Sequence, residues 1–386
     1  MGIYEDSLRL HEKLQGKIEV ISRMPITSRE DLSLLYTPGV AEACRQIAKD
    51  EERSFTLTRR GHLVAVITDG TAVLGLGDIG PAAGMPVMEG KCALFKAFGD
   101  VDAIPLCIDS KDTDEIVSII TRLAKNFGGI NLEDIAAPRC FEIERRLKET
   151  LDIPVFHDDQ HGTAIVVAAA LLNACKVTGK NLTRAAIVIN GAGAAGCAIA
   201  GLLLKMGARD LILCDRDGIL DADDARLNPM QKELAKNTNR FGRKGKLPDA
   251  LIGADVMIGV SRGHLVDAEM VSRMHDGIVF ALANPEPEID PAEALRGGAK
   301  VVGTGRSDYP NQINNVLVFP GIFKGALQAR AKKITDAMEM AAARAIASMV
   351  QGEELSATHI LPSALDKRVA QVVAEAVCKE AQRSGS

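Results

Sequence analysis

A strand, a glycine-rich turn and a helix follow one another near the middle of the chain, and this order restricts the fold more than any other feature. Residues 185–190 form an apolar run that predicts a buried strand. Directly after it, at the start of a predicted helix, come Gly191, Ala192, Gly193, Ala194, Ala195 and Gly196. Here the first glycine permits a tight turn, the second allows close approach of a pyrophosphate, and the third lets helix and strand pack closely. The motif therefore predicts a dinucleotide site whose phosphates sit on the helix N-terminus.

The residues after the next predicted strand bear on which dinucleotide binds. Asp215 lies about 20 residues beyond the last glycine, where a carboxylate can accept a hydrogen bond from a ribose hydroxyl. A carboxylate also repels a 2′-phosphate, so Asp215 favours NAD. Arg216 follows directly and can pair with the same phosphate, which leaves NADP open.

A second glycine pattern, GLGDIG at residues 75–80, also follows a predicted strand. The next residues, PAAGMP, contain two prolines and predict that no helix continues from the turn. We therefore expect these glycines to shape an active-site wall, and not a second nucleotide site.

Strands and helices alternate along most of the chain, which predicts an α/β fold with parallel sheets. Apolar runs at residues 63–68, 256–260, 278–283 and 300–302 read as buried strands, whereas residues 323–383 read as helix interrupted once, at Pro362. A chain of 386 residues is long enough for two or three domains. We predict an N-terminal α/β domain over residues 1–160, a Rossmann-type domain over 161–320, and C-terminal helices over 321–386 that pack on the N-terminal domain or on a partner subunit.

Composition excludes some classes of function. The net charge is −5, and the chain has 10 Phe, 3 Tyr and no Trp. Without a basic field or aromatic platforms, nucleic acid is not expected as a partner. No apolar run reaches the length of about 20 residues that a membrane span needs, and the charged N-terminus lacks a signal-peptide core. We expect a cytoplasmic protein that does not bind membranes.

Two acidic pairs stand out, Glu133–Asp134 and Asp158–Asp159. An isolated acidic pair is usually a helix cap or a solvated surface. The second pair, however, lies in the dense polar run HDDQHGT ahead of an apolar helix, where so many polar residues have little use in folding. Carboxylates without thiolates suit a hard cation, Mg²⁺ or Mn²⁺. His157 and His161 have no further His or Cys beside them, so we interpret them as structural or supporting residues.

Four other polar residues are candidates for chemistry. Lys91 enters an apolar helix; in a dry pocket near a cation its pKa would fall, and it could act as a base. Tyr36 precedes a Pro-Gly turn and could donate a proton from a loop. Asn284 ends a predicted parallel strand, and Asn315 lies with Asn314 in a polar patch; their amides suit a carboxylate. Taken singly, Lys91 and Tyr36 are more often ordinary surface residues.

Several long motifs, in one order and spanning nearly the whole chain, resemble those of the malic enzyme family. They are LLYTPGV around Tyr36, TDGTAVLGLGDIGPAAGMPVMEGK at residues 68–91, NLEDIAAP, VFHDDQHGTA, NGAGAAG, LANPEPE and GTGRSDYPNQINNVLVFPG. The length resembles that of the short prokaryotic members, which lack an attached phosphotransacetylase-like domain. Motifs in a shared order are far more specific than any one of them.

The resemblance implies oxidative decarboxylation of L-malate to pyruvate and CO₂ with reduction of NAD(P)⁺, and it implies a homodimer. Malate and the metal would bind in the 1–160 domain, near the cleft between the domains. By match to the family motifs the roles would be these: general acid, Tyr36; general base in contact with substrate, Lys91; a carboxylate that tunes this base, Asp158; metal ligands, Glu133, Asp134 and Asp159; groups for the substrate carboxylate, Asn284 and Asn315, with Asn284 also near the cofactor.

One departure and two alternatives remain open. The larger eukaryotic members carry an arginine in the TDGxx segment that grips a carboxylate, and this chain has Ala72 there. A malolactic-type enzyme would keep NAD bound and release lactate. A non-catalytic NAD(P)-binding regulator would keep the fold without turnover.

Overall fold

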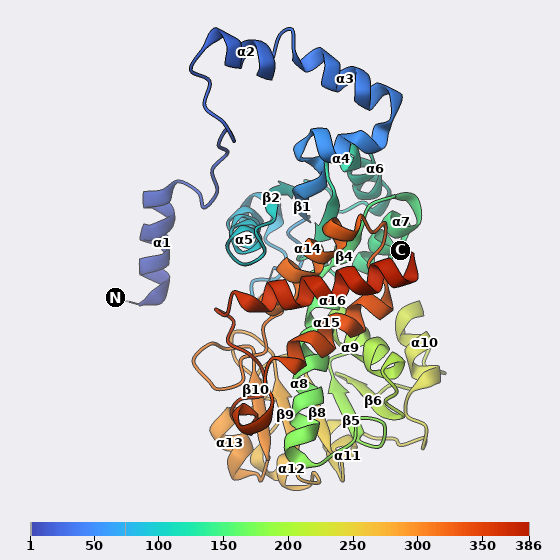
Figure 1. Ribbon diagram of the computed structural model, residues 1–386. Coiled ribbons are helices and arrows are strands. Elements are labelled where there is room, and N and C mark those ends of the chain that lie inside the picture. Colours follow the sequence, from blue (N-terminus) through green and yellow to red (C-terminus); the bar gives the residue numbers. More distant parts are fainter. Residues whose placement is uncertain (1, 74, 386) are drawn as a thin grey trace.

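The computed structural model describes residues 2–73 and 75–385 and places two parallel sheets one after the other along the chain (Figure 1). The first sheet has the strand order β2-β1-β3-β4, and the second has β10-β9-β8-β5-β6-β7. The α/β class with a Rossmann-like second sheet is thus confirmed. The predicted strands agree with the observed ones within a few residues.

The first sheet is built on the apolar run 63–68. Its strands are β1 (Leu63–Thr68), β2 (Asp102–Cys107), β3 (Gly129–Leu132) and β4 (Val155–His157). Alternate side chains of β1 point to opposite faces of the sheet. Ala65 and Ile67 belong to the core under α6 (Thr113–Leu123) and α7 (Arg139–Thr150), whereas Val64 and Val66 belong to the core shared with α5 (Gly80–Leu94). Helices therefore cover both faces.

The helix α5 contradicts the expectation that no helix follows GLGDIG. Pro81 lies in the first turn, where no N–H group is needed, and Pro86 lies inside the helix at the cost of one hydrogen bond. Met88 and Cys92 are buried on the side of α5 that packs on β1 and β2. This packing is a tertiary effect that outweighs the local preference of proline.

The second sheet begins with β5 (Ala186–Asn190), which the glycine motif follows. Its other members are β6 (Asp210–Asp215), the antiparallel edge strand β7 (Gly218–Ile219), β8 (Val256–Gly259), β9 (Ile278–Ala281) and β10 (Val301–Thr304). The helices among these strands are α9 (Ala194–Lys205), α10 (Pro229–Asn237), α11 (Leu247–Leu251), α12 (Ala268–Ser272) and α13 (Pro291–Arg296).

Between the two sheets the chain runs through a π-helical turn η5 (Asp158–Gly162) into α8 (Thr163–Thr178). By length and apolar composition alone the stretch Asp158–Thr178 could cross a membrane. In the structure, 67% of its most apolar window is buried, and α8 packs on α9 and on the C-terminal α15. The stretch is apolar because it lies in the protein core.

The C-terminal helices bind the two halves together. They are α14 (Phe319–Ala329), α15 (Asp336–Ser348) and α16 (Arg368–Ser384), and α16 packs on both of the others. Residues 349–367 are mostly not helical, so the expectation of an almost continuous helix was wrong there. The buried Asn173 amide donates to the carbonyls of Ala347 and Ile360 at 2.8 and 2.9 Å, which satisfies this irregular backbone through a residue far away in sequence.

The N-terminal segment stands apart from this core (Figure 1). It contains α1 (Ile3–Leu14), α2 (Arg29–Leu35), α3 (Val40–Lys49) and, where it joins the body, α4 (Ser54–Leu57). None of α1, α2 and α3 has a buried residue. We call residues 18–50 the N-terminal arm. Just before it, Lys17 is tied to α5, since its backbone N–H donates to Glu89 at 3.0 Å and its ammonium group to the Pro86 carbonyl at 2.6 Å.

Candidate active site

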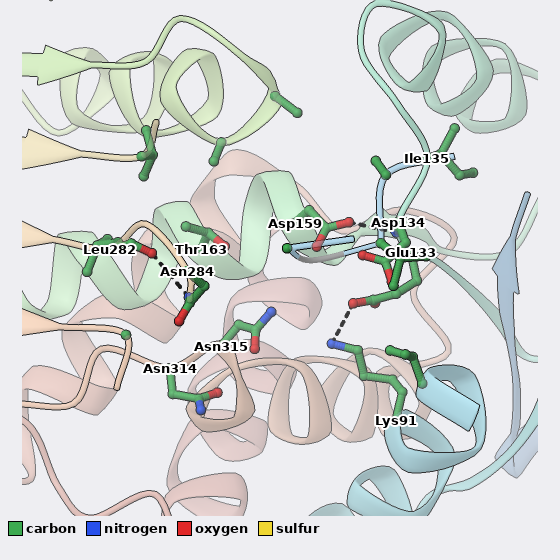
Figure 2. A pocket seen from close by; sticks show the side chains of 18 of the residues that line it. Lys91, Glu133, Asp134, Ile135, Asp159, Thr163, Leu282, Asn284, Asn314 and Asn315 are labelled. Carbon is green, nitrogen blue, oxygen red and sulfur yellow. Dashed lines mark hydrogen bonds and ion pairs between the residues drawn. The ribbon is translucent and has the colours of Figure 1, made fainter. Parts of the chain in front are cut away.

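A cavity of about 1140 Å³ collects polar residues from both halves of the chain (Figure 2). The residues follow the carboxyl ends of parallel strands, where open α/β sheets bind ligands. From the first half come Lys91, Glu133, Asp134 and Asp159, and from the second half Ala194, Ala195, Asn284, Asn314 and Asn315. Residues far apart in sequence, such as Lys91 and Asn315, thus meet in one cavity between the two sheets.

Three carboxylates form a compact group on one wall of the cavity. Oxygen atoms of Glu133, Asp134 and Asp159 all lie within 4.8 Å of one another. Glu133 and Asp134 follow β3 directly, and the π-helical turn after β4 carries Asp159. The backbone N–H of Asp134 donates to Asp159 Oδ2 at 2.8 Å, which fixes the spacing of the group.

A positive charge would stabilise the ionised form of these three carboxylates. Burial, together with mutual repulsion, raises the pKa of Glu133, Asp134 and Asp159 above their ordinary values. Asp134 Oδ2 is buried and has no hydrogen-bond partner among the described residues. An all-oxygen set with an unsatisfied buried carboxylate oxygen fits a hard divalent cation such as Mg²⁺ or Mn²⁺.

Lys91 lies beside the carboxylates, 8% exposed, on α5. Its ammonium group is 2.5 Å from Asp158 and 2.9 Å from Glu133, and it lies 4.2 Å from the centroid of the Phe319 ring. Burial lowers the Lys91 pKa, but the charges of Asp158 and Glu133 outweigh burial and raise that pKa above its ordinary value. For the side chains alone this is the opposite of the expected direction, because two carboxylates lie close to the amine. The expected lowering of the Lys91 pKa near a bound cation stays a prediction.

Among the asparagines in the cavity, Asn284 and Asn314 lie on the side away from Lys91, and Asn315 lies between them and Lys91 (Figure 2). Asn315 Nδ2 donates to Asp158 Oδ2 at 2.5 Å, so Asn315 and Lys91 share one carboxylate. Asn284 Nδ2 donates to the carbonyl of Leu282 at 3.2 Å, just beyond β9. Ala72, Gly75 and Gly77 line the cavity as well.

The glycine motif has the geometry of a tight strand-to-helix turn. Gly191 has a φ of +118°, and a Cβ there would lie 2.5 Å from the Val260 carbonyl oxygen. A Cβ on Gly196 would lie 1.7 Å from the Gly191 oxygen, whereas a Cβ on Gly193 would point into open space. Backbone N–H groups at the start of α9 are thus open to a ligand, as a pyrophosphate requires.

The two residues expected to choose the dinucleotide differ in how firmly they are held. Asp215 ends β6, and its Oδ1 accepts from the backbone N–H groups of Asp217 and Gly218 at 2.8 and 3.1 Å. The Arg216 side chain is almost fully exposed. A fixed carboxylate and an exposed guanidinium, whose Nε lies 3.7 Å from Asp217 Oδ2, therefore follow one another at the end of β6.

The structure does not bring Tyr36 to this cavity. Tyr36 directly follows α2, in the N-terminal arm, and is 68% exposed. It is absent from the described residues that line the cavity. Among the predicted catalytic residues, Lys91 and Asp158 are in contact, and Tyr36 is apart from both.

The sequence analysis missed Asn131 and the carboxylate partners of His161. Asn131 donates to Glu133 Oε2 at 2.9 Å from inside β3; an amide in an apolar strand is a signal that could have revealed it. Behind η5, His161 lies 2.9 Å from Glu144 on α7 and 2.9 Å from Glu339 on α15. Although burial opposes it, the carboxylates raise the His161 pKa to about 9. No local pattern links three residues so far apart in sequence.

Comparisons with known proteins identify the family of this chain. Residues 15–148 match the model of the malic enzyme N-terminal domain, and residues 160–382 match that of the malic enzyme NAD binding domain. The chain is 53% identical to a bifunctional malic/malolactic enzyme of Bacillus subtilis, over all of this chain and 94% of the relative. It is 56% identical to an NAD-dependent malic enzyme of Geobacillus stearothermophilus, over 96% of this chain and 77% of the relative.

A solved structure gives the same result. The crystal structure of malic enzyme from Pyrococcus horikoshii superposes with a TM-score of 0.96 at 49% identity, covering 100% of this chain and 92% of that one. Both halves of the chain, the fold and the sequence agree on one assignment: this chain belongs to the malic enzyme family.

Proposed function

We propose that this protein oxidises L-malate and decarboxylates it to pyruvate and CO₂, with NAD(P)⁺ as hydride acceptor and a divalent cation as cofactor. The observation that carries the proposal is the buried Lys91, held between Asp158 and Glu133 beside a three-carboxylate group, in a cavity that also reaches the N-terminus of α9. Proton transfer, metal binding and dinucleotide binding need these three features in one place.

The cofactors supply part of the chemistry: a cation held by Glu133, Asp134 and Asp159 would act as a Lewis acid on malate oxygens, and the nicotinamide would take the hydride from C2. A cation on the carboxylates would offset the charges that raise the Lys91 pKa, and Lys91 in its neutral form would then accept the proton of the C2 hydroxyl group. Asp158 orients Lys91 and, through Asn315, couples it to the opposite wall.

Two further residues complete the proposed reaction. Asn284 and Asn315 donate their amide N–H groups to a substrate carboxylate, a role that a basic residue at position 72 would otherwise share. Tyr36 donates the proton that C3 needs after CO₂ has left. Support for Tyr36 comes from the motif around it, since its side chain lies outside the cavity of its own chain.

The experiment is a direct assay with L-malate and Mn²⁺, in which NAD⁺ and NADP⁺ are supplied separately and the products are identified. We expect metal-dependent reduction together with pyruvate, and a Lys91→Ala control that is slower by about 10²–10⁴-fold. Cofactor binding without turnover of malate would contradict the proposal and leave a regulator.

A malolactic reaction is the second candidate, favoured by the Bacillus subtilis relative, whose name includes that activity. Lactate as product, without free reduced cofactor, would identify it in the same assay.

Three finer points are proposals of the same kind. The fixed Asp215 carboxylate favours NAD over NADP, and Asp215→Ala is expected to improve the use of NADP. A homodimer and a cytoplasmic location remain predictions of the sequence.

A further inference from the structure

We propose that Glu144 on α7 positions the two aspartates of the turn η5, and that the affinity of the site for a divalent cation depends on this contact. Asp158 and Asp159 lie between His157 and His161, and the Glu144 carboxylate contacts both of these flanking residues. The inference rests on the proposed function, because it concerns the metal and proton-transfer groups of that reaction. Glu144 is thus a positioning residue, which acts through η5.

Glu144 is a carboxylate on an otherwise apolar face of its helix. It shares the buried side of α7 with Cys140, Ile143 and Leu147, at helical spacing, and it is 5% exposed. Removing a charged carboxylate from water is costly unless the carboxylate is paired and hydrogen-bonded. An apolar side chain at this position would pack without that cost, so helix packing alone does not account for an acid here.

The two carboxylate oxygens of Glu144 reach the two ends of η5. Oε1 accepts from the backbone N–H of His157 at 3.0 Å, and Oε2 lies 2.9 Å from Nε2 of His161. Because β4 is the edge strand of the first sheet, no further strand of the described chain pairs with the outer side of its last residue, His157. One side chain therefore holds both of the residues between which the aspartates lie.

The side chains held in this way are those that the proposed reaction uses. Asp158 binds the Lys91 ammonium group at 2.5 Å and accepts from Asn315 Nδ2 at 2.5 Å. Asp159 accepts from the backbone N–H of Asp134 at 2.8 Å and belongs to the three-carboxylate group. A shift of η5 would move both aspartates away from these partners. Loss of a residue that orients a metal ligand typically lowers metal affinity about 10–100-fold.

Glu339 on α15 provides a matched comparison within the molecule. Its Oε1 lies 2.9 Å from Nδ1 of the same His161 ring, and Glu339 is also 5% exposed. Among the described residues Glu339 contacts one end of η5, whereas Glu144 contacts both. If charge balance alone mattered, the two acids would be equivalent, but a role in positioning makes Glu144 the more important one.

Two substitutions of Glu144 separate its reach from its charge. Glu144→Asp keeps the charge but is one carbon shorter, so it is too short to hold both ends of η5. Glu144→Gln loses the charge but keeps the length, so its oxygen can accept from the His157 N–H while its NH₂ group donates to the His161 ring. We expect Glu144→Asp to lower the affinity for Mn²⁺ by about tenfold or more, and Glu144→Gln to lower it less.

The affinity is measured by titrating each purified protein with Mn²⁺ alone and following free Mn²⁺ by electron paramagnetic resonance. Urea unfolding shows that each variant is folded at the temperature of the titration. Glu339→Gln is the control, and its Mn²⁺ affinity should change less than that of Glu144→Asp. If Glu144→Asp does not fold, His161→Ala removes the contact at one end of η5 and should lower the affinity in the same direction, again by more than Glu339→Gln does.

Other orders of affinity overturn the inference. A larger loss in Glu144→Gln than in Glu144→Asp would show that Glu144 acts by its charge. Equal affinities of the two Glu144 variants, or a loss in Glu339→Gln as large as that in Glu144→Asp, would leave Glu144 with a structural role only.

The titration requires no turnover, which separates this inference from the proposed function. Protein that binds Mn²⁺ with the expected order of affinities but does not oxidise malate would contradict the proposed function alone. Active wild-type protein whose Glu144→Asp variant binds Mn²⁺ equally well would contradict the inference alone. Wild-type protein that binds no Mn²⁺ would contradict both.

Discussion

Both ends of this chain carry amphipathic helices, but only those at the C-terminus have their apolar side chains covered within the chain. Glycines let α14 and α16 approach closely: a Cβ on Gly321 would lie 2.6 Å from Val373, and one on Gly325 would lie 2.5 Å from the Ala374 carbonyl oxygen. In the N-terminal arm, α2 and α3 have no buried residue. The difference teaches that apolar side chains on a helix predict burial. They do not tell whether the helix is covered by its own chain or by another molecule.

The comparison leads us to expect that the arm serves the reaction, whereas the C-terminal helices serve the stability of each subunit. Changes at the two ends should therefore have separable effects on turnover, unfolding and dimerisation.

The largest expected effect is on turnover, from the arm. Tyr36→Phe should lower kcat by about 10²–10⁴-fold, because the proton donor to C3 is lost. Its free energy of unfolding should not change, since the ring is 68% exposed in the subunit. Steady-state kinetics and urea unfolding of the isolated subunit measure the two quantities. A large loss of stability would show that the arm supports the subunit fold.

For a change in the C-terminal helices we expect the opposite: a loss of stability without a loss of dinucleotide binding. Phe323 on α14 is fully buried, with its ring centroid 5.4 Å from that of Phe95 and 5.8 Å from that of Phe156. Phe323→Ala should lower the free energy of unfolding by about 3–5 kcal/mol. Binding of dinucleotide by the protein that remains folded should be unchanged at low temperature. A loss below about 1 kcal/mol would argue against this packing.

A charged network also ties α15 to the first half, and its effect should depend on pH. Glu144 is buried between His161 and Lys148, and although burial opposes it, these cations lower its pKa. Replacing it by glutamine should cost about 3 kcal/mol of unfolding free energy, because buried cations lose their partner.

The sign of the pH dependence follows from His161. Its folded pKa of about 9 exceeds the ordinary 6.5, so its contribution is complete below pH 6.5 and is lost as pH rises through 9. The difference in unfolding free energy between wild type and Glu144→Gln should therefore be largest near pH 6, at about 3 kcal/mol, and smaller near pH 10. A difference that grows with pH would contradict the assignment.

The smallest expected effect concerns the exposed apolar side chains of the N-terminal arm and tests whether they contribute to dimerisation. Val20→Glu should weaken the predicted homodimer by about tenfold or more, because Val20 is 90% exposed in the subunit and the change places a charge on a surface that we expect a second subunit to cover. Analytical ultracentrifugation over a range of concentrations measures the dissociation constant. Leu365→Glu is the matched control, since Leu365 is also largely exposed, at 78%, but lies near the C-terminus. Equal effects of the two changes would remove the arm from the interface.

Local patterns were sufficient for most strands and for the nucleotide turn. The runs that became β1, β5 and β6 are apolar except at their ends, and the glycines after β5 are required by approaches as short as 1.7 Å. The helix α5 was missed because Pro81 and Pro86 are unfavourable locally, while its burial against β1 and β2 is not visible in the sequence.

The candidate site was likewise predicted only in part. Motifs identified Lys91, Asp158 and the three carboxylates, but not their contacts with Asn131 or the network of Glu144, His161 and Glu339. These contacts join β3, α7, η5 and α15, whose distances depend on the packing of the whole chain.

By itself, the sequence determined the α/β class, the family, the dinucleotide turn and the residue types of the site, because each depends on neighbours in the chain or on motifs in a shared order. Only the tertiary structure decided that two carboxylates raise the Lys91 pKa, that α5 forms in spite of its prolines, and that Tyr36 lies outside its own cavity. The physical reason is that charge coupling and burial depend on distances through space, which spacing along the chain does not fix.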